Sequence, residues 1–220
     1  TVSPLTFLTE TRADTPVVME LSSWQLGDLA QSPQLKPKIA LITHIMPDHQ
    51  NWYGSMERYV ADKKIIYRNQ DKTDYTICNY DDGWGKTFAQ ETAGQVFWYS
   101  AHPLPPHLFG AWIASDGSAR IRLTPGDDRP LLPPRIAVPG AALKQNVMAA
   151  SLALALYGAD LQKIPPVMQN YGGIPHRLEF FYETEQFKFY NDSAATIPEA
   201  AAAAVNAFEK SVILITGGTD

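Results

Sequence analysis

Short apolar runs rich in β-branched residues alternate along this chain with stretches that have helical periodicity. The runs 17–21, 39–45 and 75–78 have the length of strands, and 55–69 has the spacing of a helix. Parallel strands need long connections, and helices usually supply them. We therefore expect an α/β fold with a mainly parallel sheet flanked by helices.

Prolines interrupt the segment 97–140, and the strand-like pieces within it are short. Asp116-Gly117 separates two of these pieces, 112–113 and 121–122. An Asp-Gly pair between apolar pieces favours a hairpin, and proline keeps strands short because it has no N–H to donate. The sequence thus predicts a small antiparallel patch within the α/β fold.

Two helical patterns, 143–157 and 165–171, precede the pair Gly172-Gly173. We expect a domain boundary just after this pair, near Ile174. Beyond it the sequence predicts a hairpin-like pair of strands at 178–182 and 187–190, an alanine-rich helix at 198–208 and an apolar strand at 212–216.

The composition excludes several classes of protein. Hydrophobic residues make up 45% and charged residues 19% of the 220 residues, as in an ordinary globular protein. The net charge of -5 disfavours nucleic acid or an anionic membrane as a partner, and no apolar run has the length of a membrane span. The single cysteine, Cys78, excludes a disulfide scaffold, so we expect a cytoplasmic protein. We also expect that Thr1 and Asp220 are the ends of a piece of a longer protein.

Glu20 is the first residue that could carry chemistry, because it ends an apolar run and Ser22-Ser23 follow it at the start of a helical pattern. Ligands of α/β sheets bind at the carboxyl ends of parallel strands, and a carboxylate there can hold Mg²⁺. Alternatively, Ser22 or Ser23 caps the helix and Glu20 lies near the positive helix end. The residues alone leave both interpretations open.

Asp48-His49 follow the next apolar run, 39–45. If both runs are parallel strands, Glu20 and Asp48-His49 lie at the same edge of the sheet, where they could bind a metal ion. The alternative is a solvated turn. Imidazole suits Mn²⁺ or Zn²⁺ better than Mg²⁺, so His49 as a ligand would need other support.

The segment 83–87, Gly-Trp-Gly-Lys-Thr, contains the ending of a phosphate-binding P-loop. The full pattern requires a glycine where Tyr80 stands, and a tyrosine there hinders the wrap around a phosphate. We interpret the segment as a turn and the start of a helix. Further along, Arg177 could clamp a phosphate, and Asp192 with Thr196 could bind a polar substrate, unless 191–193 is only a turn before the alanine-rich helix.

Taken together and in this order, these segments resemble the Mur ligases. The run Glu-Leu-Ser-Ser-Trp-Gln at 20–25 is most similar to the branch of the family that adds D-glutamate to UDP-N-acetylmuramoyl-L-alanine in peptidoglycan synthesis. The similarity covers nearly the whole chain and includes Asp48-His49, Lys63-Lys64, the turn 79–82, the stretch 139–146, Pro175-His176-Arg177 and the stretch 191–196.

The resemblance implies a division into 1–173, the later part of a central ATP-binding domain, and 174–220, the start of a C-terminal Rossmann-like domain. The family's P-loop would lie upstream of Thr1, so the chain alone is expected to be inactive. The implied cofactors are ATP and Mg²⁺, with Mn²⁺ as an alternative, and the partners are small-molecule substrates rather than nucleic acid or membrane. The implied reaction passes through an acyl phosphate.

The resemblance also implies roles for individual residues. Lys63, His49 and Asp192 would be catalytic, and Glu20, His49 and a carbamylated Lys63 would hold metal ions. Lys63 would share a face with Tyr59 and Tyr67, while Lys64 would be an ordinary solvated lysine. The remaining roles are Asn146 at the nucleotide base, Arg177 at the phosphates, and Ser22 and Thr196 at the substrate.

Three places differ from the family's usual residues: Ala142-Leu143 replace a histidine-asparagine pair, Ala194 replaces a lysine and His44 replaces an asparagine. Another Mur ligase, a folylpolyglutamate synthase-like amide ligase and a non-catalytic Mur-like subunit are therefore the alternative functions.

Overall fold

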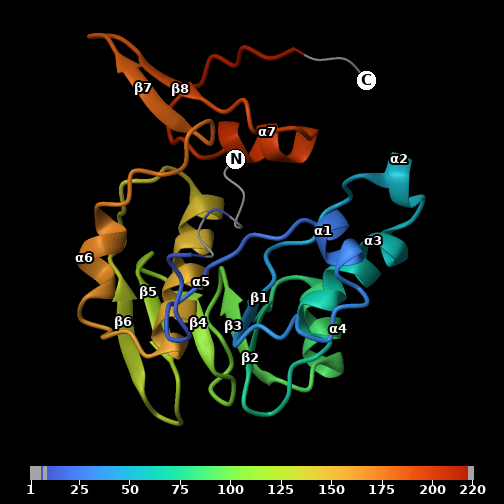
Figure 1. Ribbon diagram of the computed structural model, residues 1–220. Coiled ribbons are helices and arrows are strands. Elements are labelled where there is room, and N and C mark those ends of the chain that lie inside the picture. Colours follow the sequence, from blue (N-terminus) through green and yellow to red (C-terminus); the bar gives the residue numbers. More distant parts are fainter. Residues whose placement is uncertain (1–5, 7–8, 218–220) are drawn as a thin grey trace.

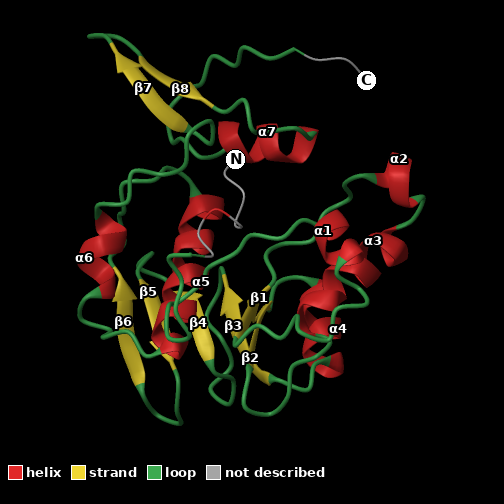
Figure 2. Cartoon of the chain, in the orientation of Figure 1, coloured by secondary structure: helices red, strands yellow, loops and turns green. Residues whose placement is uncertain are grey.

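The computed structural model describes residue 6 and residues 9–217, so the two chain ends discussed above lie outside the described residues. Its main element is a six-stranded sheet with the strands in chain order, and a two-stranded sheet follows it (Figures 1 and 2). The strands of the main sheet are β1 (Ile39–Leu41), β2 (Tyr75–Asn79), β3 (Gln95–Ser100), β4 (Gly110–Ile113), β5 (Ala119–Arg122) and β6 (Asp128–Leu132).

Strands β1 to β4 run parallel, while β5 and β6 are antiparallel to their neighbours. The α/β class and the mainly parallel sheet are thus confirmed. The predicted hairpin at Asp116-Gly117 joins β4 to β5. The antiparallel patch extends the main sheet, because β4 pairs with the parallel strand β3 on its other side.

Helices cover both faces of the main sheet (Figure 1). Alternate residues of one strand serve different cores, as when Ile77 of β2 joins the core under α5 and α6 and Cys78 joins the core under α3 and α4. The helices before the two-stranded sheet are α1 (Ser23–Asp28), α2 (Gln50–Tyr53), α3 (Met56–Lys64) with the 3-10 turn η2 (Ile65–Tyr67), α4 (Gly83–Glu91), α5 (Ala141–Tyr157) and α6 (Ile164–Gln169).

The two-stranded sheet consists of β7 (Glu179–Glu183) and β8 (Lys188–Asn191), and helix α7 (Pro198–Val205) follows it. The predicted hairpin and alanine-rich helix are therefore present. Gly140, with a φ of +83°, lets the chain just after α7 approach the start of α5, because a Cβ there would lie 2.6 Å from the Cβ of Ala207. The division into domains at 173–174 stays a prediction.

Two of the predicted strands, 17–21 and 212–216, are wrong. Neither segment has strand structure, and Val18 and Ile215 are 96% and 93% exposed. An apolar run becomes a strand only where a neighbouring strand satisfies its N–H and C=O groups. Within the described residues no strand pairs with either segment.

None of the helices in the described part of the chain has the length and apolar character needed to cross a membrane.

Candidate functional site

The structure brings together four residues from three separate segments: Glu20, Asp48 and His49, and Lys63 of α3. Burial lowers the pKa of the Lys63 amine, while the carboxylates of Glu20 and Asp48 act on it in the opposite direction. Lys63 is half-buried, as are Asp48 and His49, whereas Glu20 is exposed. A half-buried lysine whose pKa is lowered although two carboxylates lie near it is a chemically unusual group and marks this cluster as the candidate site.

His49 is held from several sides. Its ring lies 4.4 Å from that of Trp24 in α1, centroid to centroid, and 6.5 Å from that of Tyr59 in α3. The Asp48 carboxylate accepts the His49 backbone N–H at 2.8 Å and lies 3.4 Å from the His49 Nε2. The backbone of His49 has a φ of +51°, which is costly for a residue other than glycine. These contacts keep the imidazole at the edge of the site.

Helix α1 packs closely on α3, which brings Trp24 to His49. Gly27 permits this approach, because a Cβ there would lie 2.9 Å from an Asp62 carboxylate oxygen. The same Asp62 accepts a hydrogen bond of 2.9 Å from the hydroxyl of Tyr53. Sequence reasoning missed Trp24, Tyr53 and Asp62, because their partners are on other elements.

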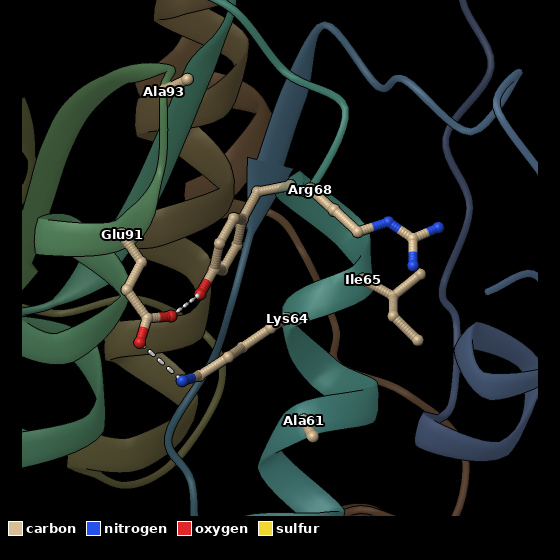
Figure 3. Close-up of a pocket in the computed structure, with 7 residues that line it drawn as sticks. Ala61, Lys64, Ile65, Arg68, Glu91 and Ala93 are labelled. Carbon is tan, nitrogen blue, oxygen red and sulfur yellow. Dashed lines mark hydrogen bonds and ion pairs between the residues drawn. The ribbon is translucent and has the colours of Figure 1, made fainter. Parts of the chain in front are cut away.

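Lys63 and Lys64 point to different partners, as adjacent residues of a helix must. The Lys63 ammonium lies 5.6 Å from the centre of the Tyr59 ring, as predicted, but Tyr67, predicted for the same face, lies with Lys64 and donates its hydroxyl to Glu91. Lys64 instead pairs with Glu91 at the end of α4, with 2.7 Å between the Lys64 Nζ and the Glu91 carboxylate (Figure 3). The prediction of an ordinary solvated Lys64 is therefore wrong.

The pocket shown in Figure 3, about 420 Å³ in volume, lies on this second side of α3. Glu91, the acidic residue that lines this pocket, accepts hydrogen bonds from both Lys64 and the hydroxyl of Tyr67. Arg68 at its rim donates to the carbonyl of Ala30. The charged groups of this pocket are thus paired with the protein itself, and Lys63 faces elsewhere.

Ser22 caps α1, as one of the two open interpretations stated. Its hydroxyl accepts the N–H of Gln25 at 3.2 Å, and the Gln25 side-chain oxygen accepts the N–H of Ser22 at 2.8 Å. This reciprocal pair is a capping box, which satisfies two N–H groups at the helix start. The substrate-binding role of Ser22 stays a prediction.

The P-loop-like segment 83–87 forms the first turns of α4, which agrees with its interpretation as a helix start. A Cβ at Gly85 would lie 2.0 Å from the backbone oxygen of Asn79 in β2. The close packing of the helix on the strand therefore requires glycine at this position, and a nucleotide site is not needed to explain it.

The remaining predicted site residues lie on other elements. Asn146 is exposed on α5, and Arg177 and Thr196 are exposed near β7 and β8. The Asp192 carboxylate accepts the backbone N–H of Leu178 at 3.0 Å and so holds the turn that starts β7. In the part of the chain that the structure describes, none of these residues has a hydrogen bond or ion pair with the cluster around Lys63.

The donor set of the cluster has oxygen and nitrogen atoms of the kind that divalent cations use: the carboxylates of Glu20 and Asp48 and the imidazole of His49. Among the described residues, however, no three His, Cys, Asp or Glu side chains lie close enough to hold a metal ion together. Glu20, Asp48 and His49 therefore do not form a single metal site by themselves, and the half-buried Lys63 is the further polar side chain near the two carboxylates.

Comparison with known sequences gives consistent matches. The family model "Mur ligase middle domain" matches residues 3–154. UDP-N-acetylmuramoylalanine–D-glutamate ligase of Treponema pallidum is 40% identical over 100% of this chain and 54% of that protein. The ligase of the same name from Symbiobacterium thermophilum is 36% identical over 93% of this chain and 44% of that protein. The chain thus spans about half the length of these relatives.

Solved structures share the fold. MurF from Acinetobacter baumannii superimposes with a TM-score of 0.62 at 20% identity, covering 78% of this chain and 37% of that one. A UDP-N-acetylmuramoyl-L-alanyl-D-glutamate–2,6-diaminopimelate ligase superimposes with a TM-score of 0.62 at 19% identity, covering 88% of this chain and 39% of that one.

Proposed function

This chain belongs to the Mur ligase family, and from that premise we propose that it is part of an ATP-dependent ligase that adds D-glutamate to UDP-N-acetylmuramoyl-L-alanine. The relatives that support this substrate pair cover the chain almost completely, and their names state the same reaction. The activity belongs to the complete, cytoplasmic protein, which would also contain the segments that this chain lacks relative to them.

The observation that carries the proposal is that the half-buried Lys63 lies near the carboxylates of Glu20 and Asp48, and that Asp48 contacts His49. In the proposed reaction the γ-phosphoryl group of ATP is transferred to the acceptor carboxylate. The neutral amine of D-glutamate then attacks the acyl carbon and forms the C–N bond. The bond between that carbon and the bridging oxygen breaks, so inorganic phosphate leaves with this oxygen and with the proton that the amine loses. Such chemistry depends on positioning and on neutralising the negative charge of the phosphoryl oxygens.

Divalent cations, Mg²⁺ or Mn²⁺, would neutralise that charge when bound at the cluster. Glu20 would hold one of them through its carboxylate, and His49 would approach the other through its imidazole. Trp24 and Asp48 would keep the His49 ring in one orientation.

Lys63 would supply further oxygen donors after its neutral amine has bound CO₂. The nitrogen attacks the carbon of CO₂, a proton leaves, and the product is an anionic carbamate with two oxygen atoms. Burial favours the neutral amine because it lowers the pKa of Lys63. The carbamate would be stable only beside cations, since Glu20 and Asp48 are already negative.

Residues 174–220 are proposed to begin a separate C-terminal domain, which would bring Arg177 to the phosphates and Asp192 and Thr196 to the substrates. Asn146 would contact the nucleotide base from α5. Its exposed position leaves it free to do so.

The full-length protein tests the function directly. With ATP, Mg²⁺ and UDP-N-acetylmuramoyl-L-alanine, phosphate release should depend on D-glutamate and not on L-lysine or diaminopimelate, although Ala194 removes a lysine charge usual in this branch. Omission of the UDP-sugar is the control and should give background release. Preference for L-lysine or diaminopimelate would assign the chain to another Mur ligase. If none of the amino acids tested gave phosphate release, a non-catalytic subunit would be favoured.

A further inference from the structure

Asp82, a residue at which the sequence gives no sign of chemistry, connects two parts of the molecule that are distant in sequence. Its carboxylate is buried, with the side chain 7% exposed. One oxygen accepts the backbone N–H of Trp84 at 2.8 Å and so caps α4. The other oxygen accepts the buried backbone N–H of Ile45 at 2.9 Å.

Ile45 lies in the loop 43–48, which leads from β1 to His49. The Ile45 side chain is buried in the core beneath α3 and α4. Within the described residues, the bond to Asp82 is the only hydrogen bond that a backbone N–H of this loop donates to another element, while the Asp48 carbonyl accepts one of 2.8 Å from the Gln50 side chain at the start of α2. Asp82 therefore anchors the backbone that carries Asp48 and leads into the strained conformation of His49.

We propose that Asp82 is a positioning residue, which fixes the loop 43–48 and thereby Asp48 and the proposed metal ligand His49. This inference rests on the proposed function, since it concerns the same cluster. Asp82 itself does not touch the cluster residues. The Nδ1 of His44 lies 3.6 Å from the carboxylate oxygen that binds Ile45.

Helix capping alone does not account for this arrangement. A cap needs one side-chain oxygen, and serine is as good a cap as aspartate. Asp82 uses both oxygens, and the second one reaches a loop 37 positions earlier in the chain. The substitution Asp82→Ser therefore separates the two roles, because the shorter serine side chain can cap α4 but has no second oxygen for Ile45.

The neighbouring residue provides a matched control. Asp81 belongs to the same turn, and its carboxylate also accepts two hydrogen bonds, from the Ser100 hydroxyl at 2.8 Å and the Ala101 N–H at 2.6 Å. Ser100 is the last residue of β3 and Ala101 follows it, so neither partner belongs to the loop after β1. Asp81→Ser removes a comparable connection without touching the loop 43–48.

Amide hydrogen exchange, followed by NMR on this chain, tests the anchoring. In Asp82→Ser the Ile45 amide should exchange roughly tenfold faster, the effect of losing one hydrogen bond to a charged group, while the Trp84 amide keeps its protection. In Asp81→Ser the Ile45 amide should exchange at the unsubstituted rate. Equal Ile45 exchange in Asp82→Ser and the unsubstituted chain would overturn the proposal.

Binding of Mn²⁺ alone to the full-length protein, measured by the electron paramagnetic resonance of free Mn²⁺, tests the positioning. Asp82→Ser should weaken binding by roughly tenfold, as the loss of groups that orient metal ligands does, and Asp81→Ser should leave it unchanged. Equal weakening in both variants, or none in Asp82→Ser, would overturn the proposal. Neither readout needs ligation, so an inactive parent protein would contradict the proposed function alone.

Discussion

At the scale of single residues, Lys63 and Lys64 are a natural pair for comparison, because they are adjacent in α3 and have different partners. In the full-length protein, Lys63→Ala should abolish most ligation, since it removes the proposed carbamate. Lys64→Ala should leave ligation nearly intact and cost at most about 1 kcal/mol of stability, as expected for a partly exposed ion pair with Glu91. Phosphate release and urea unfolding measure the two effects. Equal loss of ligation in both variants would show that Lys63 has no special role.

At the scale of elements, the packing of α4 on β2 depends on Gly85. Alanine is intrinsically the better helix former by about 1 kcal/mol, yet Gly85→Ala should destabilise the protein by about 1–3 kcal/mol, because its Cβ would collide with the backbone oxygen of Asn79. Gly83→Ala, in the same helix, is the control, since a Cβ there meets nothing within 4 Å. It should be neutral or stabilising in urea unfolding. A stable Gly85→Ala variant would mean that the glycine serves something other than this helix contact.

At the scale of the whole molecule, the described residues offer no P-loop, because 83–87 is helical. Backbone N–H groups of such a loop form much of a nucleotide phosphate site. We therefore expect that the isolated chain shows no micromolar binding of ATP with Mg²⁺ in titration calorimetry, whereas the full-length protein does. Micromolar binding by the isolated chain would return the start of α4 to consideration as a phosphate site.

The sequence by itself determined the features that depend on local physics. Asp116-Gly117 predicted the hairpin because few residues suit its turn, and Tyr80 argued against a P-loop because of its size. Glu20 and Asp48-His49 were predicted to share one edge because each ends an apolar run. The structure places both near Lys63, although the run before Glu20 is not a strand.

Only the tertiary structure decided which partners each group has. The runs 17–21 and 212–216 have the composition of strands, but a strand requires a neighbour for its backbone, and composition does not say whether one is there. The same holds for side chains: the pairing of Lys64 with Glu91 and the bond from Ile45 to Asp82 join residues far apart in the chain. Such contacts form when helices pack on the sheet, so their physical cause is the packing of the whole molecule and not the local pattern.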